Sequence, residues 1–115
     1  MKKNSISPDL WKREYERLCQ GLATLGYISQ GSVLDRSSLR PPRSGYQWTR
    51  KLARKTVTVA LSPEQFLALR DAIQNRRKLQ QTIAKMEKLS RQILFGTLPD
   101  TRRRKSLPRK VLGTI

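Results

Sequence analysis

Histidine is absent from this chain of 115 residues, and Cys19 is its single cysteine. A disulfide within the chain is therefore excluded, and so is a metal site built from cysteine and histidine ligands. Histidine is also the side chain that most often transfers protons at neutral pH. Cys19 falls on the apolar face of a predicted helix, where we expect a buried, unreactive thiol.

Acidic residues are scarce, with 8 Asp and Glu against 25 Lys and Arg, which gives a formal net charge of +17. The acids are scattered along the chain, and Asp9 and Glu64 stand where helix starts favour acids. No glycine-rich phosphate-binding loop is present either. The sequence therefore predicts that the protein is not an enzyme and binds no cofactor and no metal.

Long apolar runs are also missing, since no stretch of about 18 apolar residues occurs. Residues 1–8 are basic but lack the apolar segment of a signal peptide. We therefore expect no membrane span and a cytoplasmic location, in the nucleoid or in another nucleoprotein complex.

Two segments show helical periodicity. The first begins at residues 7–9 (Ser-Pro-Asp) and is predicted to end at Gly26. Its apolar residues recur at spacings of four and three: Trp11, Tyr15, Leu18, Leu22 and Leu25. The second begins at residues 62–65 (Ser-Pro-Glu-Gln), a capping-box pattern, and continues for about 30 residues without glycine or proline until Gly96.

Residues 45–61 alternate in polarity on both sides of a short basic connection, which predicts an antiparallel β-hairpin. One face carries the apolar residues Tyr46, Trp48, Val57, Val59 and Leu61. The other carries Gln47, Thr49, Lys51, Thr56 and Thr58, with Arg50, Arg54 and Lys55 near the tip. Trp48 is expected to be buried in the core.

A short strand near residues 32–36 completes a predicted three-stranded sheet, and residues 37–44 read as a proline-containing loop. The predicted fold class is thus α+β: an N-terminal amphipathic helix, a small three-stranded antiparallel sheet, a long C-terminal helix and a disordered basic tail. The predicted boundaries are 1–6 for a flexible N-terminus, 7–95 for a single domain and 96–115 for the tail.

The excess of positive charge opposes compaction unless a polyanion neutralises it, so nucleic acid is the leading partner. The polar side of the hairpin suits a nucleic-acid groove or backbone, although a plain solvated sheet face has the same composition. Three consecutive cations interrupt the apolar stripe of the long helix at residues 75–78 (Asn-Arg-Arg-Lys). They are interpreted as a phosphate clamp, or else as side chains that reach water over apolar surface. The predicted contact residues are Arg36, Arg40, Arg43, Gln47, Thr49, Arg50, Lys51, Arg54, Lys55, Thr56, Thr58, Arg76, Arg77, Lys78, Arg102, Arg103, Arg104, Lys105, Arg109 and Lys110.

The functional hypothesis is non-catalytic nucleic-acid binding, with DNA ahead of RNA, as an accessory factor of a larger nucleoprotein machine. Two alternatives stay open: binding to RNA or a ribonucleoprotein, and a protein-interaction module or self-association through the long helix. The salt dependence of binding distinguishes nucleic-acid binding from the helix-mediated interaction. Phosphate binding weakens steeply as the salt concentration rises, whereas an apolar contact between helices does not.

The chain also resembles a family of short, uncharacterised prokaryotic proteins found near mobile elements and transposase genes. The resemblance lies in residues 31–33 (Gly-Ser-Val), 45–51 (Gly-Tyr-Gln-Trp-Thr-Arg-Lys), 55–58 (Lys-Thr-Val-Thr), 61–65 (Leu-Ser-Pro-Glu-Gln) and 75–79 (Asn-Arg-Arg-Lys-Leu). The family has a cysteine-rich loop where this chain has residues 37–43, so the resemblance implies no metal site here. It implies a role near mobile elements but no activity.

The order of elements also looks like the three-stranded DNA-binding domains of the AP2 and integrase arm-binding type, an analogy of fold alone.

Overall fold

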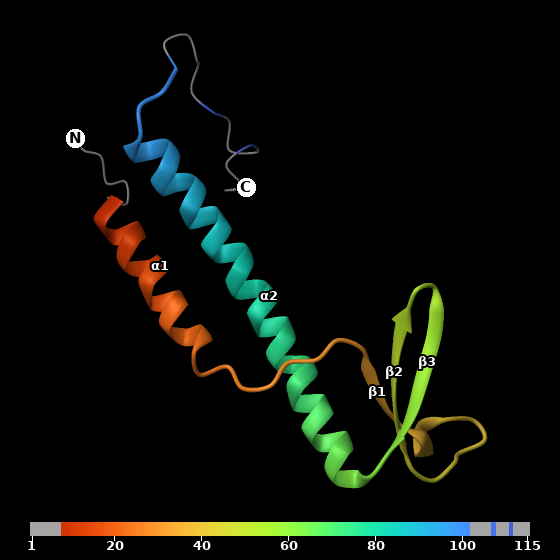
Figure 1. The fold of residues 1–115 in the computed structure, drawn as a ribbon. Helices are drawn as coiled ribbons and strands as arrows, with labels where there is room; N and C mark the ends of the chain where they lie inside the picture. Colours follow the sequence, from red (N-terminus) through yellow and green to blue (C-terminus); the bar gives the residue numbers. More distant parts are fainter. Residues whose placement is uncertain (1–7, 102–106, 108–110, 112–115) are drawn as a thin grey trace. The chain divides into compact units, whose positions relative to one another are not determined.

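The computed structural model describes residues 8–101 together with Leu107 and Val111 (Figure 1). Along these residues two α-helices flank a three-stranded antiparallel sheet, so the predicted α+β fold is confirmed. The chain divides into two compact units. The sheet unit is Leu25–Leu79, and the helical unit combines the chain before Leu25 with the chain after Leu79.

The helices are α1 (Pro8–Leu22) and α2 (Pro63–Thr97), and the strands are β1 (Ser32–Asp35), β2 (Tyr46–Leu52) and β3 (Lys55–Leu61). A short 3-10 turn, η1 (Arg36–Ser38), follows β1. The first part of α2 belongs to the sheet unit and the rest to the helical unit. Neither helix in the described part of the chain combines the length and the apolar character needed to cross a bilayer.

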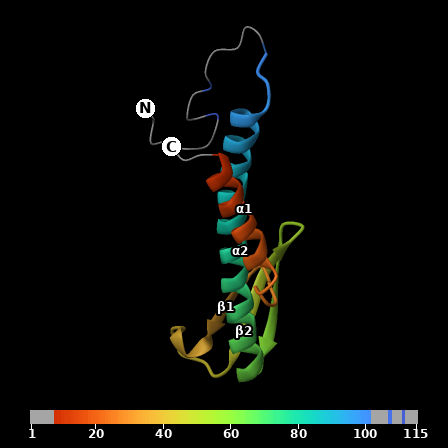
Figure 2. The same cartoon turned by 90° about the vertical axis from the view of Figure 1, so that its left-hand side faces the viewer.

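In the sheet, β2 is the central strand, with β1 and β3 antiparallel on either side of it (Figures 1 and 2). Trp48 stands opposite Val33 on one side and Val59 on the other, and Tyr46 stands opposite Leu61. Residues opposed in an antiparallel ladder project to the same face. The predicted register, which pairs apolar with apolar residues, is therefore confirmed.

The first turns of α2 cover one end of this apolar face. The rings of Tyr46 and Phe66 stack with their centroids 4.4 Å apart. In α2, Ala72 and Ile73 are buried. Further along the sheet the cover is incomplete, because Val59 stays 43% exposed. The core of the sheet unit is consequently small, and the first turns of α2 close only part of it.

Two hydrogen bonds hold the segment between α1 and β1 against α2. The backbone N–H of Ser29 donates to the carbonyl of Ala72 at 3.2 Å. The side-chain amide of Asn75 donates to the carbonyl of Tyr27 at 2.9 Å. Since both bonds join residues of the sheet unit, they fix the path of the chain as it enters β1.

The start of α2 is the one predicted from the sequence. The hydroxyl of Ser62 accepts a hydrogen bond from the backbone N–H of Gln65 at 3.1 Å, and the Gln65 side-chain oxygen accepts one from the N–H of Ser62 at 3.0 Å. This reciprocal pair is a capping box. Pro63 occupies the first helical position, where its missing N–H costs nothing.

The end of α2 differs from the prediction. The helix continues through Gly96 to Thr97, whereas the sequence analysis ended it before Gly96. A Cβ atom at Gly96 would lie 3.1 Å from the indole ring of Trp11. The glycine therefore allows a close approach of α1 to α2 rather than terminating the helix.

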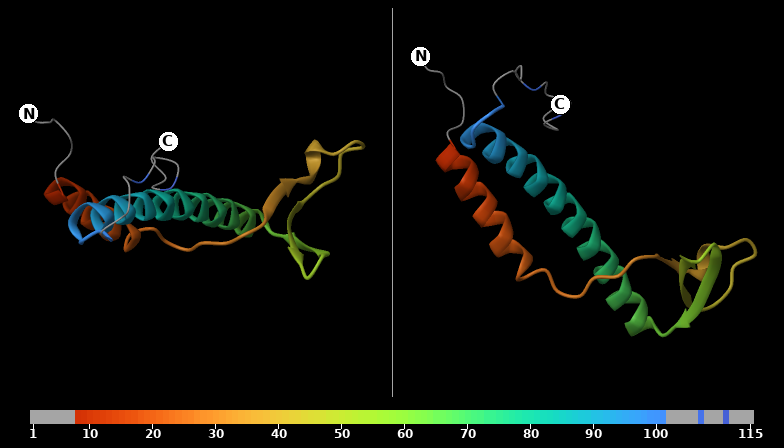
Figure 3. Two further views of the ribbon diagram at one scale, coloured as in Figure 1. Left: turned by 90° about the horizontal axis from the view of Figure 1, so that it is seen from above. Right: turned by 45° about the horizontal axis from the view of Figure 1, so that its top comes forward.

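Helix α1 runs antiparallel to the last part of α2 within the helical unit (Figures 1 and 3). It ends at Leu22, so Leu25 lies outside the helix that was predicted to contain it. Gly26 has a positive φ of 86°, the left-handed conformation expected of a turn glycine. It does not terminate the helix as predicted, because the helix already ends at Leu22. The predicted capping residue Ser7 lies outside the described residues.

The prediction that Cys19 is buried is wrong, because this thiol is exposed. In α1 the buried residue is Leu18. Among the described residues of this unit, α2 is the one helix beside α1, so the covered part of α1 is narrower than the apolar stripe of the sequence. Cys19 stands at the edge of that stripe and therefore remains in contact with solvent.

Candidate nucleic-acid interface

One face of the sheet is polar. In the hairpin register Lys51 stands opposite Thr56, Thr49 opposite Thr58, and Gln47 opposite Ala60. We call these six residues the polar face. Lys51 and all three β3 residues are exposed, whereas Gln47 and Thr49 are half-buried. The structure thus brings together on one surface all five residues that the sequence analysis assigned to it.

No acidic residue of the three strands lies on the polar face. On β1 the residues that share it are Ser32 and Leu34. Asp35, the one acid of the strands, stands opposite Tyr46 and therefore lies on the other side of the sheet. Amide, hydroxyl and ammonium groups without a competing carboxylate are suited to phosphate oxygens and base edges.

Asp35 organises the loop that follows β1. Its carboxylate accepts hydrogen bonds from the backbone N–H of Ser37 at 3.0 Å and from the Ser37 hydroxyl at 2.8 Å. The backbone bond, followed by the hydroxyl bond, lowers the pKa of Asp35 below its ordinary value. The carbonyl of Arg36 accepts from the N–H groups of Leu39 and Arg43, both at 3.1 Å. Hydrogen bonds among its own residues therefore hold the loop in shape.

The same loop supplies a cation to the polar face. Nε of Arg36 donates a hydrogen bond to Oε1 of Gln47 at 3.2 Å, which places the guanidinium group at the edge of this face. Arg40 and Arg43 are exposed in the loop. Among the described residues, no hydrogen bond links their side chains to the polar face.

The tip of the hairpin is a two-residue turn formed by Ala53 and Arg54, with φ angles of 50° and 70°. Left-handed conformations at both positions are typical of type I′ turns, which favour Asn-Gly. Most residues other than glycine and asparagine are strained in this conformation, at a cost of up to about 3 kcal/mol each. The turn thus holds Arg54 between the exposed cations Lys51 and Lys55, at a cost in stability.

Arg50 does not lie on the polar face. It alternates with Lys51 along β2 and stands opposite Val57, on the same side as Trp48. Its guanidinium carbon lies 5.7 Å from the centroid of the Trp48 ring, a cation–π geometry. Lys55 stands opposite Leu52 and shares this side. Cations therefore occur on both sides of the tip, and the polar face itself contains fewer of them than predicted.

The three consecutive cations of α2 belong to the sheet unit. Arg76 is half-buried, whereas Arg77 and Lys78 are exposed. Within residues 8–101, no hydrogen bond or ion pair joins them to the hairpin. The predicted residues of the tail lie outside the described residues: Arg102, Arg103, Arg104, Lys105, Arg109 and Lys110.

The predicted contact residues in the described part of the chain are free of ion pairs. Between described residues, ion pairs join Arg17 to Glu14 and Arg70 to Asp71. The hydrogen bond from Arg17 lowers the pKa of Glu14, with a smaller contribution from the charge of Lys85. In the same residues, no three His, Cys, Asp or Glu side chains lie close enough together to hold a metal ion.

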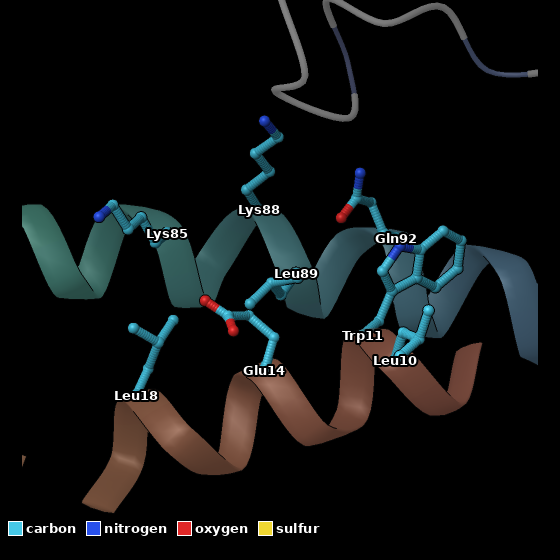
Figure 4. Close-up of a pocket in the computed structure, with 8 residues that line it drawn as sticks. All are labelled: Leu10, Trp11, Glu14, Leu18, Lys85, Lys88, Leu89 and Gln92. Carbon is cyan, nitrogen blue, oxygen red and sulfur yellow. The ribbon is translucent and has the colours of Figure 1, made fainter. Parts of the chain in front are cut away.

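A second surface feature was missed by the sequence analysis: an open groove of about 470 Å³ in the helical unit (Figure 4). Its lining comes from four residues of α1 and four of α2: Leu10, Trp11, Glu14 and Leu18, and Lys85, Lys88, Leu89 and Gln92. The helical periodicity of the sequence identified two of its apolar residues, Trp11 and Leu18, as packing residues. Only the structure shows how much of these apolar side chains the two helices leave exposed.

A scan of protein-family models finds no match to the chain, and neither does a search of curated proteins or of solved structures.

Proposed function

We propose that this chain is a non-catalytic nucleic-acid-binding protein that places the polar face of its hairpin against duplex DNA, as an accessory factor of a larger nucleoprotein machine. The observation that carries the proposal is the composition of this face. Its amide, hydroxyl and ammonium groups lie on one side of a two-stranded ribbon, with Arg36 at one edge and Arg54 at the tip. No carboxylate of the strands shares it.

DNA is favoured over RNA by the shape of this surface. The major groove of B-form DNA admits a two-stranded β-ribbon, whereas that of an A-form RNA helix is too deep and narrow for side chains to read. Gln47 has the amide that pairs with adenine, and threonine methyl groups suit the methyl group of thymine. These residues are proposed to contact bases, and Lys51, Arg54 and Arg36 to contact phosphates.

Binding is tested with one duplex sequence prepared as DNA and as RNA, titrated at several salt concentrations. We expect a dissociation constant of micromolar or below for DNA at low salt. With on the order of six to ten phosphate contacts, affinity should fall about 10³–10⁵-fold between about 50 and 200 mM salt. A flat salt titration rejects the electrostatic interface, and equal or tighter binding to duplex RNA rejects the preference for DNA.

Two variants with the same change of charge separate the polar face from the general charge of the chain. Ala60 is exposed on the polar face, and Ala84 is exposed on α2 in the helical unit. Ala60→Glu sets a carboxylate against the phosphates and should weaken binding at least about tenfold, since like charges in an interface cost several kcal/mol. Ala84→Glu should change affinity little. Equal losses in the two variants contradict the assignment of the interface to this face.

A further inference from the structure

The outer edge of β3 carries backbone groups that no other described strand pairs with. The sheet ends at β3, which has β2 as its neighbour on the other side (Figure 1). Bonded and non-bonded pairs alternate along an antiparallel ladder, and Leu52 and Lys55, which close the two-residue turn, are a bonded pair. By alternation, Thr56, Thr58 and Ala60 direct their N–H and C=O groups away from β2.

The two edges of the sheet differ in their protection against an added strand. β1 is four residues long and passes directly into the η1 turn. Short edge strands, prolines, bulges and charged side chains are the usual protections of an edge. β3 is seven residues long, pairs with β2 without a bulge, and has no proline and no charge after Lys55. Its edge is therefore open to another strand.

The apolar side of this edge is also incompletely covered. Val59 is 43% exposed and Val57 is half-buried. Val59 also lines an open pocket of about 460 Å³, together with Leu61 of β3 and Leu69 of α2. Side chains of neighbouring strands that share a face pack against each other. A strand laid along β3 would therefore remove part of Val57 and Val59 from water.

The residues of β3 match a second copy of the same strand. In an antiparallel pair centred on Thr58, that residue stands opposite Thr58 of the other copy, and Thr56 stands opposite Ala60. This register sets outward-directed groups against outward-directed groups, as the bonded pairs of a ladder require. Val57 then stands opposite Val59, with both apolar rows on one side. The pair has a two-fold axis, so every contact occurs twice.

Charge does not prevent this register, although the sheet unit has eleven basic residues against three acids. Residues 56–61 carry no charge, and the hairpin tips of the two copies point in opposite directions. Each Arg54 lies about four residues from the axis, so at about 3.4 Å per residue the two are about 27 Å apart along the strands. That separation exceeds the screening length of about 8 Å at physiological salt.

From these observations we infer that two copies of this chain pair through their β3 edges and form a continuous six-stranded antiparallel sheet. The inference does not depend on the DNA-binding proposal, because it rests on backbone groups and is tested without nucleic acid. One pair of strands is a small contact, and interfaces of that size associate weakly. We therefore expect a dissociation constant of about 200 μM.

The first test is NMR on an equal mixture of isotope-labelled and unlabelled chains at about 1 mM, where about seven tenths of the chains are paired. Salt at about 1 M screens charges over about 3 Å and releases bound nucleic acid. Val57 and Val59 of one strand have Cα atoms about 7 Å apart, whereas a non-bonded pair across two strands has them about 4.5 Å apart. An NOE between the Cα protons of Val57 and Val59 is thus expected between labelled and unlabelled chains, and its absence overturns the inference.

A matched pair of variants tests the outward N–H group at the axis. Thr58→Pro and Thr58→Ala both lose the side-chain hydroxyl, but the proline variant also loses the N–H. Proline is tolerated on an edge strand where its nitrogen faces away from the sheet, so the variant is expected to fold. Sedimentation equilibrium at about 1 mM should give a monomer for Thr58→Pro and mostly dimer for Thr58→Ala. Equal association of the two variants contradicts the edge pairing.

Amide exchange with water distinguishes a second copy from any other cover of the edge. At about 20 μM most chains are unpaired, so exchange at Thr56, Thr58 and Ala60 should be about threefold faster than at about 1 mM. The N–H of Arg54, in the turn, should exchange equally at both concentrations. Exchange that is equally slow in the dilute sample would show that another segment of the same chain covers the edge. That result, or fast exchange at both concentrations, overturns self-association.

Discussion

At the scale of single residues, the best-defined side chain is the indole of Trp48. Its N–H donates to the carbonyl of Gln30 at 3.0 Å, and the guanidinium group of Arg50 lies over the ring, 5.7 Å from its centroid. A Cβ atom on Gly31 would come within 2.6 Å of the same nitrogen, and Gly31 has a positive φ of 104°. Glycine is therefore required beside the ring. These contacts fix Trp48, although it is half-buried and not enclosed in the core as the sequence predicts.

Replacement of Trp48 by alanine is the corresponding prediction. We expect the free energy of unfolding to fall by about 2–3 kcal/mol, less than the 3–5 kcal/mol typical of a fully enclosed ring. Trp48→Phe keeps an aromatic ring, though a smaller one, and loses the hydrogen bond to Gln30; it should cost about 1 kcal/mol. Denaturant unfolding measures both. Folded Trp48→Ala protein should still bind DNA, because Trp48 lies opposite the polar face; normal stability with lost binding would show that the other face makes the contact.

Alternation of side chains along the strands was enough to predict which residues share the polar face. The same rule places Arg50 beside Trp48, but its position near the tip led the sequence analysis to group it with the other cations. The exposure of a side chain was harder to predict than the face on which it lies. Periodicity identifies the apolar stripe that contains Cys19 without showing how many neighbouring elements cover it.

At the scale of elements, the hairpin was predictable and its turn was not. The flanking strands have the required alternation, but Ala53 and Arg54 are not the residues that a type I′ turn favours. The register of the strands imposes the left-handed conformation on them. A local conflict of this kind often marks a position retained for function, which agrees with the proposed phosphate contact of Arg54.

Two substitutions in this turn should separate stability from binding. Ala53→Asn introduces a residue that tolerates the left-handed region, so stability should rise by about 0.5–1 kcal/mol with binding unchanged. Arg54→Gly should stabilise the fold by a similar amount or more, yet weaken DNA binding and reduce the salt slope by about 1. Thermal unfolding and salt titrations measure the two effects. Unchanged affinity in Arg54→Gly would remove this arginine from the interface.

The long helix shows why one end was easier to predict than the other. Its start is specified by local hydrogen bonds between Ser62 and Gln65, which the capping-box pattern of the sequence predicts. At its end, Gly96 has the same appearance as a helix terminator but serves the contact with Trp11. That contact joins residues distant in sequence, so no local pattern indicates it.

At the scale of the whole molecule, the division into two units follows a feature visible in the sequence. The apolar stripe of the long helix is interrupted by residues 75–78 (Asn-Arg-Arg-Lys), and the border between the units falls directly after them, between Leu79 and Gln80. From the sequence, these cations are interpreted as a phosphate clamp, or else as side chains that reach water over apolar surface. Positive charge is divided almost equally between the units, because the sheet unit has eleven basic residues against three acids and the rest of the chain has fourteen against five.

The contribution of the tail is tested by a truncation placed after Thr101. Since α2 extends to Thr97 and Gly96 lies against Trp11, a cut at Leu94 would remove the end of the helix, whereas a cut after Thr101 keeps both helices and the Gly96–Trp11 approach. Removal of residues 102–115 takes away six basic residues and no acid. If each contacts a phosphate, the slope of log affinity against log salt should become less steep by about 5.

The loss of affinity should be the same for every DNA sequence, because phosphate contacts do not distinguish bases. Any preference among sequences should survive, since the polar face is intact in the truncated protein. Salt titrations of full-length and truncated chains on two unrelated duplexes measure both quantities. An unchanged slope would show that the tail does not contact phosphates. A preference lost with the tail would place the base contacts beyond Thr101 and leave the sheet with phosphate binding alone.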